Sequence, residues 1–442
     1  MFKSNSAALS LSAGACPVSD RVPLPGGFVL EYFFMKIFLD VTSSCTSVQN
    51  TGMQRMTRKI FAELSKRAPV TPLCWNKIGR FYQRLGPVEQ KLLTRPFDVS
   101  SRPTKRPEIQ GENPIAELRR FAFLSRFDFA SSLTEDDLFI SPDSHHDSRR
   151  KYLPGLIRGT QVRSLAIFHD AARLRLSSLY RLRKQRYREY VESLAAFDRV
   201  ICISVEARDD LHQLWHQFGC QPTPVTVEPW PAEMHGNAPE NESAAAARLI
   251  VCVGSLDPRK NHRALLLAAR DLWREGLDFE LHLIGRATKF SRRKIMSEIR
   301  NLQSAGRPIR WLRHVDDETL LREYRNCRFT VYPSLLEGYG LPIVESLLHG
   351  KPCVCGGNGA LGEVAQGGGC FIVDQTKVEA LAHGMRRLLL DRELYARLCA
   401  EARARKFRSW TDYIETLLEL FQTTARPAPV RTRKFGDRGG GF

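Results

Sequence analysis

The sequence predicts an α/β protein in which two doubly wound parallel sheets form separate domains. Its 442 residues exceed what one ordinary hydrophobic core accommodates, so two domains are expected. Short runs with the character of β-strands alternate with helical patterns, which is typical of parallel sheets covered by helices. The composition, 43% hydrophobic and 26% charged, is that of a globular protein. Sheets of this kind bind ligands at the carboxyl ends of their strands.

The first domain is predicted to span residues 35–235. Residues 1–34 are rich in Ser, Gly and Pro without periodicity, so we expect a disordered N-terminal extension, with order beginning at Met35 in the strand-like MKIFLDV. Apolar residues at helical spacing predict a helix over Thr57–Arg67 and a long, very basic one over Arg173–Leu194. Further strands are predicted at Val70–Trp75, Leu138–Ser141, Leu165–Phe168 and Arg199–Ile203.

The second domain is predicted to span residues 249–408, after a linker at 236–248 that lies in a stretch rich in Pro, Asn, Glu and Ala. A C-terminal helix at 409–425 could cross back to the first domain, and the basic tail at 426–442 is expected to be disordered. Strands are predicted at Leu249–Val253, Phe279–Ile284, Phe329–Tyr332, Pro352–Cys355 and Cys370–Val373, with helices at His262–Glu275, Asp317–Asn326 and Gly340–Leu348.

Charge and cysteine content restrict the function classes. The net charge of +18 calls for an anionic partner, which could be nucleic acid, an anionic membrane surface or a phosphorylated substrate. No zinc-finger, RNP-like or helix-turn-helix pattern is visible, which disfavours nucleic acid. The eleven cysteines are scattered without CxxC spacing, and no run approaches the ~20 apolar residues of a spanning helix. We therefore expect a cytoplasmic protein with reduced, buried cysteines.

The sharpest local pattern is PSLLEGYGLPIVESLLHGKP, residues 333–352, which follows an apolar strand and opens a helix. Gly338 and Gly340 lie between strand and helix, where free backbone N–H groups make an anion site. Glu345 falls about one turn into the helix, where a carboxylate can accept both hydroxyls of a ribose. For an isolated pair such as Glu337 and Glu345, a capping acid plus a solvated helix residue is the alternative.

The same segment closely resembles the donor-site motif of the retaining GT-B glycosyltransferases of family four. The resemblance continues in register over about 249–391, in VCVGSLDPRKNHRALLLAA, FELHLIG, HVDDETLLREYRNCRFTVYPS and GALGEVAQGGGCFIVD. In the first half it is carried by NTGMQR, FHD and CISVEARDDL, which look like the mannosyl- and rhamnosyltransferase branch with a TG-x-QR loop. The resemblance implies a GT-B fold, two Rossmann-like domains facing a cleft.

The resemblance also implies residue roles. Glu345 would bind the donor ribose, Glu337 would lie beside the donor sugar, and Arg259 and Lys260 would neutralise the diphosphate. Many members have an arginine directly after the glycine at the end of the VG strand, where this sequence has Ser255, so either Arg259 supplies that charge or donor binding is weakened. His169 would project into the cleft, with Asp170 orienting its loop. The donor-binding set is completed by Gly52, Arg55, Ser204, Gly254, Gly338, Tyr339, Gly340 and Leu341.

Structural alternatives stand beside three of these roles. Arg55 could be an ordinary first-turn helix residue, Ser204 could only cap a helix, and Arg259 with Lys260 could be a solvated turn. The neighbouring His145, His146 and Asp147 are poor joint metal ligands because adjacent loop residues rarely converge on one ion. We expect no metal or other cofactor. The resemblance implies retention of configuration at the anomeric carbon, for which we expect front-face attack assisted by the departing phosphate.

The predicted function is therefore transfer of a hexose from a nucleotide-sugar, GDP-mannose being favoured, to a saccharide or lipid-linked acceptor. A non-catalytic GT-B subunit and a nucleic-acid-binding protein are the alternatives. Basic residues with interspersed apolar ones fill Arg119–Arg126 and Arg173–Arg188, so we also expect peripheral contact with anionic membrane; a solvated basic face is the competing explanation.

Overall fold

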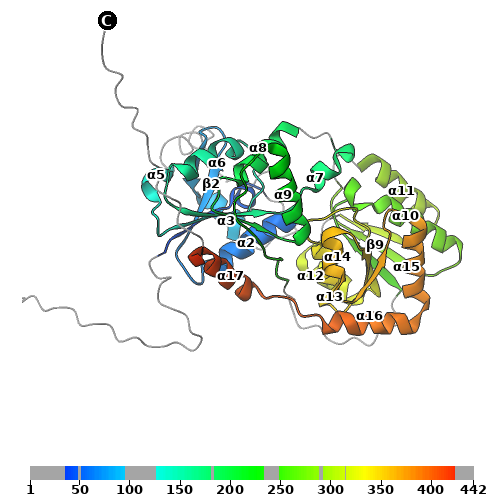
Figure 1. The fold of residues 1–442 in the computed structure, drawn as a ribbon. Coiled ribbons are helices and arrows are strands. Elements are labelled where there is room, and N and C mark those ends of the chain that lie inside the picture. Colours follow the sequence, from blue (N-terminus) through cyan, green and yellow to red (C-terminus); the bar gives the residue numbers. More distant parts are fainter. Residues whose placement is uncertain are drawn as a thin grey trace, which may run out of the picture.

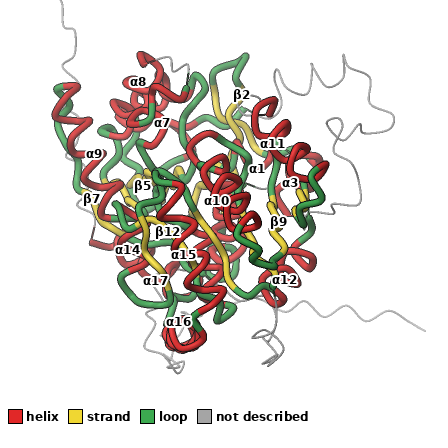
Figure 2. The backbone as a smooth tube through the Cα atoms, turned by 90° about the vertical axis from the view of Figure 1, so that its right-hand side faces the viewer, coloured by secondary structure: helices red, strands yellow, loops and turns green. Residues whose placement is uncertain are grey.

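The computed structural model describes residues 35–47, 51–94, 126–180, 184–232, 248–287, 292–313 and 315–423. It contains two α/β domains side by side, the first drawn in blue to green and the second in green to orange (Figure 1). Helices flank the strands of both sheets (Figure 2). The predicted extension at 1–34, the tail at 426–442, nearly all of the linker, and Arg119 and Arg120 lie outside the described residues.

The N-terminal domain is built on a seven-stranded sheet in the order β3-β2-β1-β4-β5-β6-β7. Every neighbouring pair is parallel except β2 and β3, which form an antiparallel hairpin. Its strands are β1 (Ile37–Asp40), β2 (Val70–Asn76), β3 (Phe81–Arg84), β4 (Leu138–Ser141), β5 (Arg163–Phe168), β6 (Arg199–Cys202) and β7 (Val225–Val227). Its helices are α1 (Thr42–Cys45), α2 (Gly52–Leu64), α3 (Pro87–Thr94), α5 (Phe129–Ser132), α6 (Arg149–Arg158), α7 (Ala172–Arg175), α8 (Lys184–Leu194) and α9 (Val205–Phe218).

The C-terminal domain has a six-stranded, wholly parallel sheet in the order β10-β9-β8-β11-β12-β13. This is the strand order of a Rossmann fold, in which the direction of winding reverses between the first and fourth strands, here β8 and β11. Its strands are β8 (Leu249–Val253), β9 (Glu280–Ile284), β10 (Ile309–Leu312), β11 (Phe329–Tyr332), β12 (Cys353–Gly356) and β13 (Cys370–Val373). Its helices are α10 (His262–Arg274), α11 (Arg292–Ser304), α12 (Asp317–Asn326), α13 (Leu341–Leu348), α14 (Gly359–Ala365), α15 (Val378–Leu390) and α16 (Arg392–Ala404).

The last described helix, α17 (Trp410–Thr423), leaves the C-terminal domain and lies against the N-terminal one (Figure 1). Its apolar face, including Tyr413, Ile414 and Leu417, is fully buried. That face packs with Ile37 and Leu39 of β1 and with residues of α2 in a single hydrophobic cluster. The N-terminal core is thus completed by the end of the chain.

The prediction of one long helix over Arg173–Leu194 is wrong. The chain forms α7 and then a 3-10 turn at Ser177–Leu179, and the stretch described from Lys184 onward begins with α8. Tyr180 has an extended backbone, and its hydroxyl donates a hydrogen bond to Asp257 of the other domain. That contact between domains takes the place of helix continuation, which a helical pattern of apolar residues cannot reveal.

Candidate active site

The candidate site residues of the C-terminal domain lie at the point where its sheet reverses winding. Gly254 directly follows β8, and the segment 333–340 follows β11, the neighbour of β8 in the sheet. Open α/β sheets bind ligands in the crevice outside the carboxyl ends of such strands. The N-terminal domain presents the corresponding edge of its own sheet, with α2 following β1 and His169 following β5. Both sets therefore meet where the two domains face each other.

The loop into α13 is shaped by glycine and proline. Gly340, the N-cap of α13, has φ of +116°, which residues with a side chain rarely adopt. Pro342 lies in the first turn, where a missing N–H costs nothing. Glycine at the cap leaves the first N–H groups of the helix without a side-chain acceptor from the cap itself. The free N–H groups at the helix N-terminus can therefore bind an anion.

Glu337 is the centre of a buried ion cluster. Its carboxylate lies 2.5 Å from Lys260 Nζ and 3.1 Å from Arg259 Nη1, and the hydroxyl of Ser334 donates to it. Burial raises the pKa of Glu337, but the charges of Lys260 and Arg259 outweigh it and lower the pKa to about 2. Glu337 therefore remains ionised at neutral pH, and the three charges leave one net positive charge beside the loop.

The two cations are held by further contacts. Lys260 Nζ also donates to the hydroxyl of Tyr332, at 2.5 Å, and lies 4.8 Å from the centre of that ring. Arg259 lies 3.8 Å from Asp170 of the N-terminal domain. Burial acts to lower the pKa of Arg259, but Glu337 and Asp170 raise it above its ordinary value, so the guanidinium stays charged. Arg259 is thus a cation that bridges the domains.

Glu345 bridges the domains a second time. One carboxylate oxygen lies 3.0 Å from Arg55 Nη1 of α2, and the other accepts a hydrogen bond of 2.8 Å from the hydroxyl of Tyr324. A carboxylate has about four lone-pair positions, so two remain for an incoming ligand. Arg55 is therefore more than a first-turn helix residue, although its partner here is a carboxylate of the other domain.

His169 is buried, and the tautomer of its ring follows from one contact. Its Nε2 lies 2.6 Å from the carbonyl oxygen of Pro142, which can only accept, so Nε2 carries the proton. Burial lowers the pKa of His169, which favours the neutral ring. Its Nδ1 is then an acceptor, and it has no hydrogen-bond partner among the described residues. Asp170 orients the loop, as expected, by accepting from the backbone N–H of Ala172.

Two glycines allow the domains to touch. A Cβ on Gly338 would stand 2.1 Å from the carbonyl oxygen of His169, closer than any real Cβ contact. A Cβ on Gly52 would lie 3.4 Å from the side chain of Leu341. Leu341 and Tyr339 also pack against the hydrophobic cluster that contains β1 and α2. The donor loop is thus seated directly on the N-terminal domain.

Ser204 and Gly254 have more local contacts. The Ser204 hydroxyl accepts from the backbone N–H of Ala207, as a helix cap does, and the next two N–H groups of α9 donate to Glu363 of α14. Gly254 lies beside the Lys260 side chain, since a Cβ there would be 3.7 Å from its Cδ. Capping of α9 therefore accounts for the hydrogen bond of the Ser204 side chain without a ligand.

The basic stretch at 173–188 is partly paired among its described residues. Arg175 contacts Glu206 and Asp210, and Arg188 contacts Glu192, while Leu174 packs against the domain core. His145 is buried between the hydroxyls of Ser141 and Ser193, away from any shared ligand position with Asp147. Among the residues the structure describes, no three His, Cys, Asp or Glu side chains converge as metal ligands. Within that same part, no helix combines the length and apolarity needed to cross a bilayer.

Three residues that lie around the site were not predicted from the sequence: Tyr324, Tyr332 and Ser334. Tyr332 ends β11 and Ser334 stands two residues later, so their position immediately before the Glu337 loop was an available signal. Tyr324 lies on α12, and only the folded structure brings it to Glu345. A buried cluster of Asp40, Asp143 and Arg149 at the ends of β1 and β4 was also missed.

Comparisons with known proteins agree with this geometry. Residues 237–405 match the family model described as glycosyl transferases group 1. The serotype-specific mannosyltransferase WbdA of Escherichia coli is 29% identical over 185 residues, 38% of this chain and 22% of WbdA. The O-antigen chain mannosyltransferase B of Escherichia coli is 34% identical over 140 residues, 31% of this chain and 36% of that protein. The matches thus span well under half of these relatives.

The whole fold has solved counterparts. Anabaena HepE, crystallised in complex with UDP and glucose, superposes with a TM-score of 0.60 at 16% identity, covering 88% of this chain and 99% of that one. At this identity the likeness concerns the fold alone. The strand order, the two facing domains and the solved counterparts lead to one assignment: the chain has the GT-B fold, and its C-terminal domain matches the glycosyl transferases group 1 family over residues 237–405.

Proposed function

We propose that the protein transfers a hexose from a nucleotide-sugar to a saccharide or lipid-linked acceptor, with retention at the anomeric carbon. The observation that carries the proposal is the Arg259–Lys260–Glu337 cluster, at the switch point of a group 1 domain and beside the N-terminus of α13. GDP-mannose is the favoured donor, since the relatives named above are mannosyltransferases. The acceptor would belong to polysaccharide, O-antigen or glycolipid synthesis.

The charges suit the departure of a diphosphate. As the bond between the anomeric carbon and the phosphate oxygen breaks, negative charge grows on that oxygen, and Arg259, Lys260 and the α13 N-terminus would stabilise it. The acceptor oxygen forms the new bond on the same face, and its proton passes to the departing phosphate. Glu337, ionised at neutral pH, would orient the two cations and the sugar rather than donate a proton. The unpaired Nδ1 of His169 would accept from a substrate hydroxyl.

A thermal-shift screen with GDP, UDP, dTDP and ADP tests the proposal. A ligand that binds only the folded protein stabilises it, by about 2.7 kcal/mol when the ligand concentration is 100 times its Kd. The melting temperature rises as a result. GDP is expected to give the largest shift, and the matching donor should then be turned over with a saccharide acceptor. Stabilisation without any turnover would favour a non-catalytic GT-B subunit, and no shift with any nucleotide would contradict the proposal.

Replacement of Glu345 by alanine is expected to weaken nucleotide binding by roughly 10- to 100-fold. The reason is that the ribose hydroxyls would lose a charged acceptor, and hydrogen bonds to charged groups contribute about 1.5–3 kcal/mol. Calorimetry with GDP measures the effect. Tyr324→Phe is the matched control, because it removes only one neighbour of that carboxylate and should change affinity little. Unchanged affinity in Glu345→Ala would show the ribose assignment to be wrong.

We expect the transfer to need no metal ion. The cationic side chains would neutralise the diphosphate, which is the task magnesium or manganese performs in metal-dependent enzymes. The rate of transfer should therefore be the same with and without excess EDTA. Complete loss in the chelator, with recovery on adding magnesium or manganese, would contradict this expectation.

We also propose peripheral contact with anionic membrane through the basic stretch around α7 and α8. Arg173, Lys184 and Arg186 are exposed there, and each basic residue near an anionic surface contributes about 1 kcal/mol. The protein is expected to sediment with anionic but not neutral vesicles and to be released by about 0.5 M salt. Equal sedimentation with both vesicle types would contradict this proposal and would mean that these basic residues only form a solvent-exposed face.

A further inference from the structure

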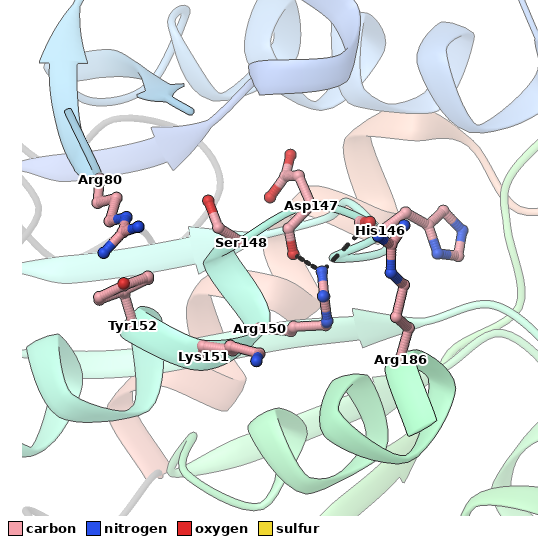
Figure 3. Close-up of a pocket in the computed structure, with 8 residues that line it drawn as sticks. All are labelled: Arg80, His146, Asp147, Ser148, Arg150, Lys151, Tyr152 and Arg186. Carbon is pink, nitrogen blue, oxygen red and sulfur yellow. Dashed lines mark hydrogen bonds between the residues drawn. The ribbon is translucent and has the colours of Figure 1, made fainter. Parts of the chain in front are cut away.

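A hollow lies in the N-terminal domain, outside the donor site described above. It has a volume of about 380 Å³, within the ~300–1,000 Å³ usual for small-molecule sites (Figure 3). One wall is the loop 142–148 that follows β4, next to β1 in the sheet. The winding of this sheet reverses between these two strands, so the hollow occupies the position where α/β sheets bind ligands.

Basic side chains from three separate elements line the hollow. Arg80 comes from the turn between β2 and β3, Lys151 from α6 and Arg186 from α8, with Arg80 and Arg186 at opposite ends (Figure 3). Asp147, the one acid in the lining, is paired with Arg149 at 3.0 Å. Across the described residues, neither Arg80 nor Arg186 has a carboxylate within ion-pair distance. We call this hollow the basic pocket.

Buried ion pairs hold the loop that forms one wall of the basic pocket. Arg149, almost completely buried, lies 2.6 Å from Asp40 and 3.3 Å from Asp143, so it anchors the loop 142–148 to the end of β1. Tyr152 forms one end of the pocket, with its ring packed toward Trp75 and the Arg80 guanidinium 5.4 Å above it. An aromatic ring and cations around one cavity suit a sugar ring that carries an anionic group.

Two hydrogen bonds connect this pocket to the donor site. Pro142, which begins the pocket loop, accepts from Nε2 of His169 at 2.6 Å. Tyr187, the neighbour of Arg186 on α8, donates to the carbonyl oxygen of Asp170 at 2.9 Å. Asp170 in turn lies 3.8 Å from Arg259. An acceptor held in the basic pocket would therefore be held by the same structural unit that carries His169.

We propose that the basic pocket binds an anionic group, a phosphate or a carboxylate, on the acceptor saccharide. The proposal rests on the proposed transferase function, since it names the chemical class of that reaction's acceptor. The phosphate could be the diphosphate of a lipid-linked sugar, and the carboxylate that of an acidic sugar. Arg80 and Arg186 would contact the anion, and Tyr152 would pack against the ring.

Three probes distinguish the sources: citronellyl diphosphate, methyl β-glucuronide and neutral methyl α-mannoside, each titrated by calorimetry. At least one anionic probe is expected to bind more tightly than the neutral one, and which of them binds identifies the source. Arg80→Gln and Arg186→Gln should each weaken that binding by about tenfold. Both side chains are exposed, so neither change disturbs a packed core. Arg158→Gln is the matched control, because Arg158 is exposed at the far end of α6 and does not line the pocket.

Nucleotide binding is measured in parallel on the same variants and should not change. Failure of the intact chain to bind any nucleotide would reject the transferase function, whatever the probes do. The pocket proposal is overturned on its own if nucleotide binds normally and no anionic probe does, or if probe affinity is the same in Arg80→Gln and Arg186→Gln as in the unaltered chain.

Discussion

Replacement of Glu337 by glutamine is expected to lower kcat by roughly 100-fold or more and to weaken nucleotide binding by a much smaller factor. Glutamine keeps the size of the side chain but removes the charge that both Lys260 and Arg259 contact. The two cations would then repel each other without a shared carboxylate and would leave the positions required to stabilise the departing phosphate. Loss of one preorganised electrostatic group costs about 10²–10³ in kcat in well-studied enzymes. Steady-state kinetics and calorimetry with GDP measure the two effects.

The matched control is Ser334→Ala. It removes one hydrogen bond to the Glu337 carboxylate but leaves both ion pairs in place, so the loss in kcat should be far smaller. Melting temperatures of both variants separate a catalytic effect from unfolding, since disruption of a buried ion pair also destabilises the protein. A Glu337→Gln variant that loses nucleotide affinity and kcat in equal proportion would place this residue in ground-state binding instead.

Replacement of Gly338 by alanine is expected to be almost as damaging, for a steric reason. The added methyl group would stand 2.1 Å from the carbonyl oxygen of His169 and 3.0 Å from Cβ of Asp170, so the donor loop must retreat from the N-terminal domain. A displacement of about 1 Å in a catalytic geometry can cost 100-fold in rate. Transfer to an acceptor should therefore fall by about that factor, because the donor and acceptor domains no longer meet correctly.

Gly155→Ala is the control for this substitution. Gly155 lies inside α6, and a Cβ there meets nothing within 4 Å, so the change should leave activity intact and stabilise the helix slightly. Small-angle scattering can report whether Gly338→Ala opens the molecule. Full activity in Gly338→Ala would mean that the contact with His169 is not maintained during the reaction.

The strands were the most predictable part of this fold. Leu249–Val253 and Phe329–Tyr332 form strands over the predicted bounds, because a short apolar run flanked by polar loops suits a strand buried on both faces. The start of α2 was less predictable. The helix begins at Gly52, five residues before the predicted Thr57, because Thr51 and Gln54 form a capping box ahead of the apolar pattern.

The site was predictable in its residue types but not in its pairings. Glu337, Arg259 and Lys260 were expected at one donor site, and the structure brings them into contact. The ion pair of Arg55 with Glu345 joins residues 290 positions apart, and its existence depends on how two domains dock. No local pattern in a single sequence carries that information. The same holds for the approach of Gly338 to His169.

The position of α17 has a consequence for biosynthesis. Residues of β1 and of α17 share one hydrophobic cluster, so β1 cannot complete its core until α17 has also been synthesised. At ~5–20 residues per second, that interval is on the order of 20–80 s. During it the C-terminal domain, whose own core is separate, can fold alone while part of the N-terminal core stays open to solvent. The face of β1 that α17 covers is therefore completed only after the C-terminal domain has been synthesised.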